Sequence, residues 1–471
     1  MKGDFTRNTF DPEKHFLRVL MQQGRVQLDS DWNEQASILL HYLQTLATDL
    51  IGPYAGPSGG NYGFAISAGA NGDFEIGKGR YYVNGILCEN EQDDITYFSQ
   101  ADYPLTEEHD ALQTGNYIVY LDVWERHINF VEDDDIREKA LNGADTATRS
   151  KVIWQVKVMP LTFQYAYCQQ GSSLLTNNLL VLSQVCMSAR AKQAQALTQP
   201  CLTEPEAQYR GAENQLYRVE IHNGNFDDDG KPITPTFKFS HENGSVIFPV
   251  KKMIPDAASA TTSVELEHFG CDDKLGLSVD DWVEYMDDRI DLHNEAKPLA
   301  QVQTIDALNR KVILSGVINV DSDYLSKHPF LRRWDQKNAN NVNAQGVMNL
   351  TADDWIKLED GIEVKFRIED AGRVRRGDYW LIPARHVTGD VEWPKVTDNN
   401  GNLIPEPLPP MGTLHYYAPL AIINENGGGG VSVRSDCRCS FRPLSYSCQY
   451  SYFGRLGIGT DLLCPQDENN Q

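Results

Sequence analysis

The sequence lacks any run of about 18–20 uninterrupted apolar residues, the length that a helix needs to cross a bilayer. It also opens at Met1 without an apolar leader, so we expect a chain that is made and assembled in the cytoplasm. Any contact with a membrane would then come through an assembly. Basic residues are few, because 42 Lys and Arg stand against 66 Asp and Glu, for a formal net charge of −24. Binding to a nucleic-acid backbone needs a basic surface, so this balance argues against nucleic acid as a partner.

Familiar catalytic and cofactor motifs are missing as well. We find no dinucleotide-binding fingerprint, no P-loop, no G-x-S-x-G elbow and no H-E-x-x-H helix. The one tempting cluster is Glu125, Arg126 and His127, where a Glu/His pair on one strand face could perform acid–base chemistry. A buried ion pair of Arg126 or an interface contact is the competing interpretation. We therefore expect a protein that is not an enzyme, with no catalytic residues and no cofactor.

The nine cysteines follow no disulfide or zinc spacing. Five are scattered and are interpreted mostly as small buried apolar residues: Cys88, Cys168, Cys186, Cys201 and Cys271. Four lie near the end of the chain: Cys437, Cys439, Cys448 and Cys464. Whether these terminal cysteines are free or paired stays open.

The length of 471 residues is too great for a single core and indicates two to four domains. The fold class that we predict is mainly β with an α-helical N-terminal segment, as a multi-domain β-sandwich or meander with a small inserted SH3-like barrel. The predicted parts are a helical docking segment (1–55), a β-domain (64–161), a helical or loop excursion (162–215), a second β-domain (216–261 plus 317–442), the inserted barrel (262–316) and a C-terminal tail (443–471).

Two local patterns support this division. Tyr81 to Val83, then Asn84-Gly85, then Ile86 to Cys88 predict a hairpin with a two-residue turn. Short strands are expected in the barrel at 263–266, 282–285, 300–304 and 311–314. In the excursion, 174–182 and 189–197 are interpreted as helices.

The N-terminal segment shows two helix starts. Asp11 precedes Pro12, and Asp31 stands three residues before Glu34, which is the spacing of a capping box. The second helix then carries an apolar stripe at helical spacing, formed by Ala36, Leu39, Leu40, Leu43, Leu46, Ala47 and Leu50. Such a stripe needs a partner surface. The segment is therefore either a two-helix lid on the chain's own β-domain or a docking element for another subunit.

Three further groups of residues are candidate sites. Asn225, Asp227 and Asp229, followed by Gly230, match the first half of a calcium-binding loop, although Thr236 stands where the bidentate glutamate would be. Arg332, Arg333 and Trp334 combine residue types that are enriched at interfaces, and Trp334 could equally be a core residue. In the aromatic tail, Tyr450 and Tyr452 are candidates for packing on a neighbouring subunit.

The sequence resembles a family of large β-rich proteins that are encoded alongside contractile injection systems and phage-tail-like particles. The resemblance rests on ordered blocks: KGDFTR and VLMQQGRVQLDSDWNEQ near the start, LDVWERH (Leu121 to His127), ALNGADTATR (Ala140 to Arg149), VIWQVKV (Val152 to Val158), YRGAENQLYRVEIH (Tyr209 to His222), FKFSHENGSVI (Phe237 to Ile247), LGLSVDDWVE (Leu275 to Glu284), GDYWLIPAR (Gly377 to Arg385) and HYYAPLA (His415 to Ala421). These blocks extend to about residue 442.

This resemblance implies a structural component of the particle, at its baseplate or distal end, and supplies no catalytic residues. The expected partners are other subunits of the particle, namely baseplate, tube or sheath-end, and spike proteins. The chain itself is expected to form a homo-oligomer of three or six copies. The particle could be free, membrane-tethered or released. Two other functions stay open: a fibre- or spike-type module that binds a receptor or glycan, and a hydrolase of polysaccharide or cell wall, which would need a positioned pair of carboxylates.

Overall fold

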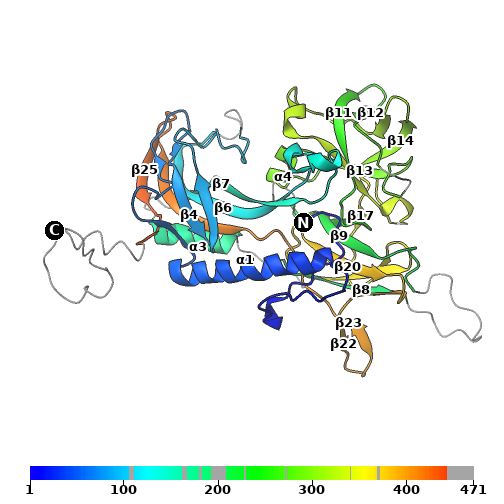
Figure 1. Ribbon diagram of the computed structural model, residues 1–471. Helices are drawn as coiled ribbons and strands as arrows, with labels where there is room; N and C mark the ends of the chain where they lie inside the picture. The colour runs from blue at the N-terminus through cyan, green and yellow to red at the C-terminus, as the bar shows by residue number, and fades with distance from the viewer. Residues whose placement is uncertain are drawn as a thin grey trace, which may run out of the picture. The chain divides into compact units, whose positions relative to one another are not determined.

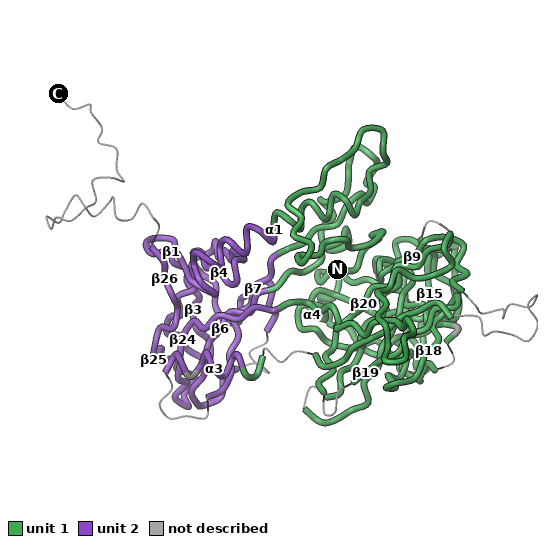
Figure 2. Tube along the Cα trace, turned by 90° about the horizontal axis from the view of Figure 1, so that it is seen from below, with its two compact units in different colours: residues 1–40, 124–151, 177–414 green, residues 41–123, 152–176, 415–471 purple. Residues whose placement is uncertain are grey.

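The computed structural model describes residues 1–105, 111–161, 167–179, 183–192, 208–226, 230–270, 272, 274–339, 341–368 and 372–442 (Figure 1). The chain is mostly β, with several sheets, a six-stranded barrel and a long helix near its start. It divides into two compact units (Figure 2): unit 1 contains residues 1–40, 124–151 and 177–414, and unit 2 contains 41–123, 152–176 and 415–471. None of the helices among the described residues has the length and apolarity that crossing a membrane requires.

Unit 2 is built mainly from two four-stranded sheets. The first has the order β26 (Ser440–Phe441), β1 (Tyr54–Pro57), β4 (Gly79–Val83) and β5 (Ile86–Asn90). The second has the order β25 (Val431–Asp436), β24 (Tyr416–Glu425), β6 (Gly115–Ile128) and β7 (Arg149–Leu161). A two-stranded sheet, β2 (Ile66–Ser67) with β3 (Glu75–Ile76), and the helix α3 (Cys168–Leu179) complete the unit. Buried side chains from both large sheets form a single core, among them Tyr81, Val83, Val119, Leu121 and Leu420.

The predicted hairpin in unit 2 is confirmed. Val83 pairs with Ile86, so only Asn84 and Gly85 form the turn between β4 and β5. Both have positive φ, 49° and 77°, which is the requirement of the two-residue turn that suits a twisted hairpin. Gly85 also lies against the backbone of the long helix, because a Cβ there would stand 2.3 Å from the carbonyl oxygen of Gln44. Glycine at this position therefore allows the hairpin to approach the helix.

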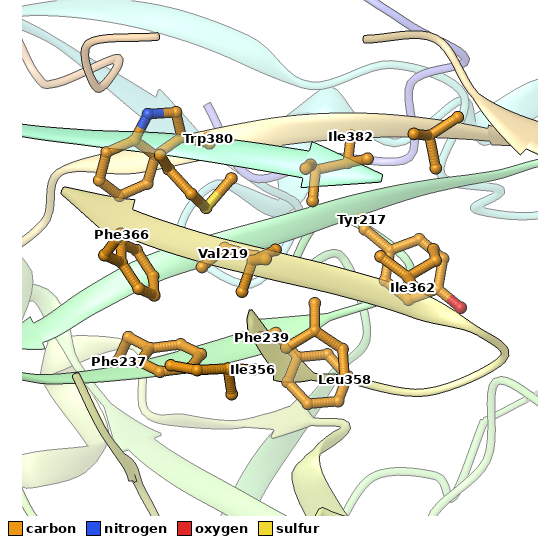
Figure 3. Packing of buried hydrophobic residues seen from close by; sticks show 14 of the residues in the cluster. Tyr217, Val219, Phe237, Phe239, Ile356, Leu358, Ile362, Phe366, Trp380 and Ile382 are labelled. Carbon is orange, nitrogen blue, oxygen red and sulfur yellow. The ribbon is translucent and has the colours of Figure 1, made fainter. Parts of the chain in front are cut away.

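Unit 1 contains a five-stranded and a three-stranded sheet that share a core (Figure 3). The larger sheet has the order β17 (Met348–Asn349), β10 (Thr236–Ser240), β9 (Gln215–Asn223), β20 (Tyr379–Arg385) and β21 (Asp390–Val391). The smaller has the order β18 (Trp355–Lys357), β19 (Ile362–Ile368) and β8 (Val185–Ala191). The pair β22 (Lys395–Thr397) and β23 (Leu403–Pro405) forms a separate ribbon. Phe237 from the larger sheet lies 5.0 Å, centroid to centroid, from Phe366 of the smaller one.

The strand β8 corrects the helix that we expected at residues 189–197. Val185, Met187, Ala189 and Ala191 alternate with more polar residues, and all four are buried in the core of unit 1. Methionine, alanine and arginine favour helices in isolation, but the pairing of β8 along all seven residues of β19 decides the structure here. The helix expected at 174–182 does exist in part, as α3, and residues 193–207 lie outside the described part of the chain.

A closed barrel of six strands also belongs to unit 1. Its order is β11 (Ile247–Asp256), β12 (Thr261–Leu266), β15 (Lys311–Ser315), β14 (Ala300–Asp306), β13 (Trp282–Met286) and β16 (Phe330–Trp334), with β16 pairing back onto β11. All four short strands expected at 263–314 are present as β12 to β15. The barrel is nevertheless wider than the predicted range of 262–316, because β11 and β16 close it. The short helix α4 (Asp288–Leu292) follows β13, and the 3-10 turns of the unit are η1 (Pro12–Lys14), η2 (Asp134–Ile136), η3 (Lys139–Leu141), η4 (Tyr324–Lys327) and η5 (Gln336–Asn338).

Candidate docking surface on the N-terminal segment

The N-terminal segment contains one long helix and not two. Asp11 does accept a hydrogen bond from the backbone N–H of Glu13, as its position before Pro12 predicted, but η1 ends after one turn at His15, which has φ 55°. The long helix α1 covers Asp29–Ile51 and starts two residues before the predicted cap. Asp31 lies inside its first turn and accepts a hydrogen bond from the backbone N–H of Leu28 (3.4 Å). The expectation of two helices is therefore wrong for residues 15–28.

The apolar stripe of α1 is exposed. The four leucines that we assigned to an interface are 54% (Leu39), 59% (Leu43), 42% (Leu46) and 76% (Leu50) accessible to solvent. Ile38, on another face of the helix, is only 6% accessible. The chain thus packs against α1 elsewhere and leaves the stripe uncovered, which contradicts the lid interpretation and leaves the docking interpretation.

Residues 1–28, which we call the arm, precede α1 and contact its first turns. The Thr6 hydroxyl donates to Asp29 (2.6 Å), and the Thr9 hydroxyl donates to Glu34 (2.5 Å). Further along, the backbone N–H of Val19 donates to the side chain of Gln35 (2.9 Å). The arm also exposes large apolar side chains, at Phe16, Leu17, Leu20, Met21, Val26 and Leu28. Both the arm and the helix therefore expose apolar side chains.

The first residues of the arm are held inside unit 1. The Lys2 ammonium forms an ion pair with Glu220 on β9 (3.1 Å). The carbonyl oxygen of Met1 accepts from the Arg218 guanidinium (3.2 Å), and that of Gly3 accepts from the Asn243 side chain (2.8 Å). These bonds connect the start of the arm to β9 and to the turn after β10.

Lys2 belongs to a buried ionic network that crosses from the five-stranded sheet to the barrel. The Lys238 ammonium on β10 donates to both carboxylate oxygens of Glu284 on β13 (2.6 and 2.7 Å), and the Trp334 indole N–H donates to Glu284 as well (2.8 Å). Burial by itself raises the pKa of Glu284, but the neighbouring cationic groups, Lys238 first among them, together outweigh burial and bring that pKa down to about 2. Burial likewise opposes ionisation of Glu220, and Lys2 leads the cations that hold the pKa of Glu220 well below its usual range.

The cluster of Arg332, Arg333 and Trp334 is buried beside this network and does not form a surface patch. All three lie on β16 and are at most 5% exposed. The Arg333 guanidinium donates to the backbone carbonyl of Gly276 (2.5 Å), and Trp334 is fully buried against Glu284. The interface assignment of these residues is therefore wrong, and the alternative of a core Trp334 is confirmed. Tyr450 and Tyr452 lie outside the described residues.

The acidic-basic cluster after Trp124 forms an ion-pair centre. The Arg126 guanidinium contacts carboxylate oxygens of Glu132 (2.6 Å), Asp288 (2.9 Å) and Asp291 (2.5 Å). This confirms the expected buried ion pair of Arg126. Glu125 accepts from the Ser150 hydroxyl (2.9 Å), while burial lowers the pKa of His127 to about 3. Because the His127 imidazole is neutral throughout the physiological range, the structure gives no support to a Glu125–His127 acid–base pair.

The calcium-loop candidate is not assembled among the described residues. The Asn225 side chain donates to the carbonyl oxygen of Gly372 (2.8 Å) and accepts from the backbone N–H of Val374 (3.1 Å), so its amide holds two loops together. Asp227 and Asp229 lie outside the part of the chain that the structure describes. Within that part, no group of three or more His, Cys, Asp or Glu side chains is arranged to hold a metal ion.

A cavity of about 320 Å³ lies beside α4 and β14 and is lined by charged and apolar groups. Its charges are matched within the chain. Lys297 pairs with Glu295 (2.6 Å), and Asp287 accepts from the Tyr285 hydroxyl (3.1 Å) and from the backbone N–H of Ile290 (2.8 Å). These groups are bonded to one another and stabilise the region around α4, so they do not favour a particular ligand.

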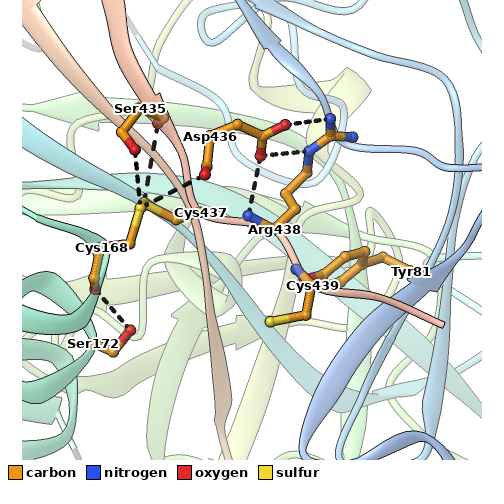
Figure 4. The surroundings of a disulfide bond; sticks show 8 residues. All are labelled: Tyr81, Cys168, Ser172, Ser435, Asp436, Cys437, Arg438 and Cys439. Atoms are coloured by element: carbon orange, nitrogen blue, oxygen red, sulfur yellow. Dashed lines mark hydrogen bonds and ion pairs between the residues drawn. A yellow bond between two sulfur atoms is a disulfide. The ribbon is translucent and has the colours of Figure 1, made fainter.

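One disulfide contradicts the interpretation of Cys168 as a buried apolar residue. Cys168, the first residue of α3, is bonded to Cys437, which follows β25, in unit 2 (Figure 4). Two residues on, the backbone N–H of Cys439 donates to the Tyr81 hydroxyl (3.0 Å). The disulfide thus connects segments 269 positions apart just before β26, which pairs with β1. Sequence spacing could not indicate this pairing, because the partners meet only in the folded unit.

Acid should destabilise unit 1 through the ionic network. Burial, aided by the charge of Lys238, lowers the pKa of His222 from 6.5 to about 4, and Nδ1 of this 3%-exposed residue has no hydrogen-bond partner among the described residues. The unfolded chain therefore binds more protons between pH 6.5 and 4, and stability falls as pH falls through this window, by about 3 kcal/mol for His222 alone. Loss of the Glu284 charge extends the decline below pH 4.5 towards pH 2.

Urea unfolding of the full chain at pH 7, 5.5 and 4.5 would measure this decline. The variant His222→Gln should flatten the curve between pH 6.5 and 4, whereas His15→Gln, at an exposed position, should not. A stability of unit 1 that is constant down to pH 4, or an identical pH dependence in the His222→Gln variant, would contradict the assignment.

Comparison with known proteins places the chain in a family without giving it an activity. The model of a family of unknown function (DUF6519) matches residues 1–178 and 166–456. No curated protein and no solved structure gives a match. The two matched segments overlap and include the N-terminal arm, α1 and the sheets of both units. The chain therefore belongs to the DUF6519 family.

Proposed function

We propose that this chain is a non-enzymatic structural component of a contractile, phage-tail-like injection particle, at the baseplate or distal end, and that it acts through subunit–subunit assembly. The single observation that carries the proposal is the exposed leucine stripe of α1. Soluble monomers rarely expose large continuous apolar patches, and such patches are typical of protein interfaces. The sequence resemblance supplies the kind of particle, and the stripe supplies the means of attachment.

The rest of the chain has features that favour a structural scaffold over an enzyme. Its β-sandwich cores and the SH3-like barrel would serve as a scaffold, and ion-pair centres such as those of Arg126 and Lys238 connect their elements. Those charged groups are occupied by one another, so they favour a structural role over catalysis. The expected neighbours are baseplate, tube or sheath-end, and spike proteins.

Quantitative mass spectrometry of purified particles, made with and without this chain, tests the proposal. We expect the chain at a multiple of three or six copies per particle, and truncated or unanchored particles in its absence. Complete particles that form without the chain would overturn the proposal and would redirect attention to a receptor- or glycan-binding module.

A further inference from the structure

The apolar residues of α1 recur at intervals of four and three residues. They are Trp32, Ala36, Leu39, Leu43, Leu46 and Leu50, which we call the heptad stripe. Every member is exposed, and Trp32 reaches 78%. An alternation of four and three is the repeat of helices that pack along one another in a coiled coil, with each side chain entering a gap on the next helix. The heptad stripe therefore needs a helix of the same repeat as its partner.

The chain's own contacts with α1 are made by residues outside the heptad stripe, among them Gln35 on its flank, which accepts from the backbone N–H of Val19. Ser30 and Ile38 are buried, Glu34 is bound by Thr9, and Gln44 is approached by Gly85. None of these residues belongs to the heptad stripe. Folding of the chain thus orders α1 fully and leaves the stripe presented in a helical conformation, so that little ordering is needed when it binds.

The residues beside the heptad stripe indicate which partner fits. One flank carries Asn33, Leu40 and Ala47, and the other carries Gln35, Tyr42 and Asp49, so Asp49 is the only charge on either flank. Residues 29–51 contain no Lys or Arg, and the remaining acids, Asp29, Asp31 and Glu34, lie in the first turns. With one acid on the two flanks, a self-associated bundle places few like charges beside the stripe. Leu40 and Tyr42 are 45% and 61% exposed, which widens the apolar face beyond the narrow seam of a two-helix coil.

We infer that α1 packs against the α1 helices of further copies of this chain, in a parallel bundle of at least three helices. A second copy supplies a helix with the same repeat, and the wide apolar face is covered only if each helix contacts two neighbours. Closed rotational symmetry makes such helices parallel and brings each stripe residue next to its counterpart. The inference rests on the proposed function and deepens it, by naming the partner of the stripe as this chain itself.

The mass of the purified full-length chain in solution, measured by sedimentation and light scattering from about 1 to about 100 µM, tests the inference. We expect a complex of three or more copies. The double variant Leu39→Glu/Leu43→Glu should weaken association at least about 100-fold, because glutamate keeps the helix propensity but cannot enter an apolar core. Both leucines are exposed within one chain, so the variant should fold, with an unchanged circular dichroism spectrum. The matched control is Thr45→Glu, at an exposed position outside the stripe, which should associate like the wild type.

A cross-linking experiment gives a second readout that does not depend on affinity. In a Cys439→Ser background, the variant Leu39→Cys should form a disulfide on oxidation between the introduced thiols of two copies, with mass spectrometry identifying the linked peptide. Thr45→Cys should give no such link. A wild type that stays monomeric at the highest concentration, a dimer, or a complex that the double variant leaves intact would each overturn the inference.

The helix bundle and the proposed function can be refuted independently of each other. A chain that is monomeric alone but present in particles at normal stoichiometry would overturn the bundle and leave the proposed function standing. A stable bundle of a chain that never enters particles would leave the bundle and overturn the proposed function.

Discussion

Replacing Arg126 by methionine should lower the free energy of unfolding of unit 1 by about 3–5 kcal/mol. The guanidinium is 7% exposed and contacts three carboxylates, those of Glu132, Asp288 and Asp291. Removal of one partner from a buried ion pair is costly because the remaining charges stay buried without compensation. Of the three carboxylates only Glu132 is as buried as Arg126, at 7% exposed, whereas Asp288 and Asp291 are 25% and 38% exposed, so the loss should be at the lower end of that range. Urea unfolding at pH 7, followed by a probe in unit 1, measures it.

The matched control for this substitution is Arg289→Met. Arg289 belongs to α4 itself, but it is 48% exposed and stands 3.8 Å from Glu295, a geometry that contributes about 0–1 kcal/mol. In the Arg126→Met background, Asp291→Asn should restore part of the stability, because it removes one uncompensated charge. If Arg126→Met costs no more than Arg289→Met, the assignment of an ion-pair centre is wrong.

Reduction of the disulfide between Cys168 and Cys437 should destabilise unit 2 by up to about 5 kcal/mol. The bond closes a loop with a sequence separation of 269 residues, and the entropy that a disulfide removes from the unfolded chain grows with the length of the loop. Thermal unfolding with and without reductant would measure the change. The double variant Cys168→Ser/Cys437→Ser should unfold at the same lowered temperature under both conditions.

Cys439→Ser serves as the control for the disulfide, because Cys439 is exposed and free. This variant should keep the full response to reductant. Thiol counting on the native protein provides an independent check, with Cys168 and Cys437 protected from alkylation until reductant is added. Modification of both residues without reductant would contradict the pairing.

Local signals predicted parts of the fold well and long-range partners poorly. The Asn84-Gly85 turn and the short strands of the barrel were readable because their patterns are contained within a few residues. The strand β8 was missed because its residues favour a helix and become a strand only by pairing with β19, more than 170 positions away. The first of the two expected N-terminal helices was predicted from a correct cap at Asp11, but nothing after His15 continues it.

The candidate docking surface shows the same difference between local patterns, which the sequence predicts, and long-range contacts, which it does not. The stripe of Leu39, Leu43, Leu46 and Leu50 could be read from spacing alone, and the structure adds that these residues are exposed. By contrast, composition suggested Arg332 and Arg333 as surface residues, because the sequence could not show that their strand closes a barrel. The partners of Arg126 were equally hidden, since Asp288 and Asp291 follow it by more than 160 positions.

The N-terminal segment is bonded to unit 1 at its first residues and exposes one face of its helix. Lys2 and the backbone of the first residues are bonded within unit 1, whereas the heptad stripe of α1 is left to solvent. The bonds of the first residues hold the start of the chain on unit 1, and the exposed stripe stays available for assembly. The central claim is therefore that the stripe, by packing against other copies of this chain, is required for its incorporation into the particle.

Incorporation of stripe variants into purified particles tests that claim most directly. Particles would be purified from cells that make the wild-type chain, the Leu39→Glu/Leu43→Glu variant or the Thr45→Glu control, and the copies per particle would be counted by quantitative mass spectrometry. We predict a multiple of three for the wild type and the control, and loss of the chain from particles for the double variant. Normal incorporation of the double variant would contradict the account.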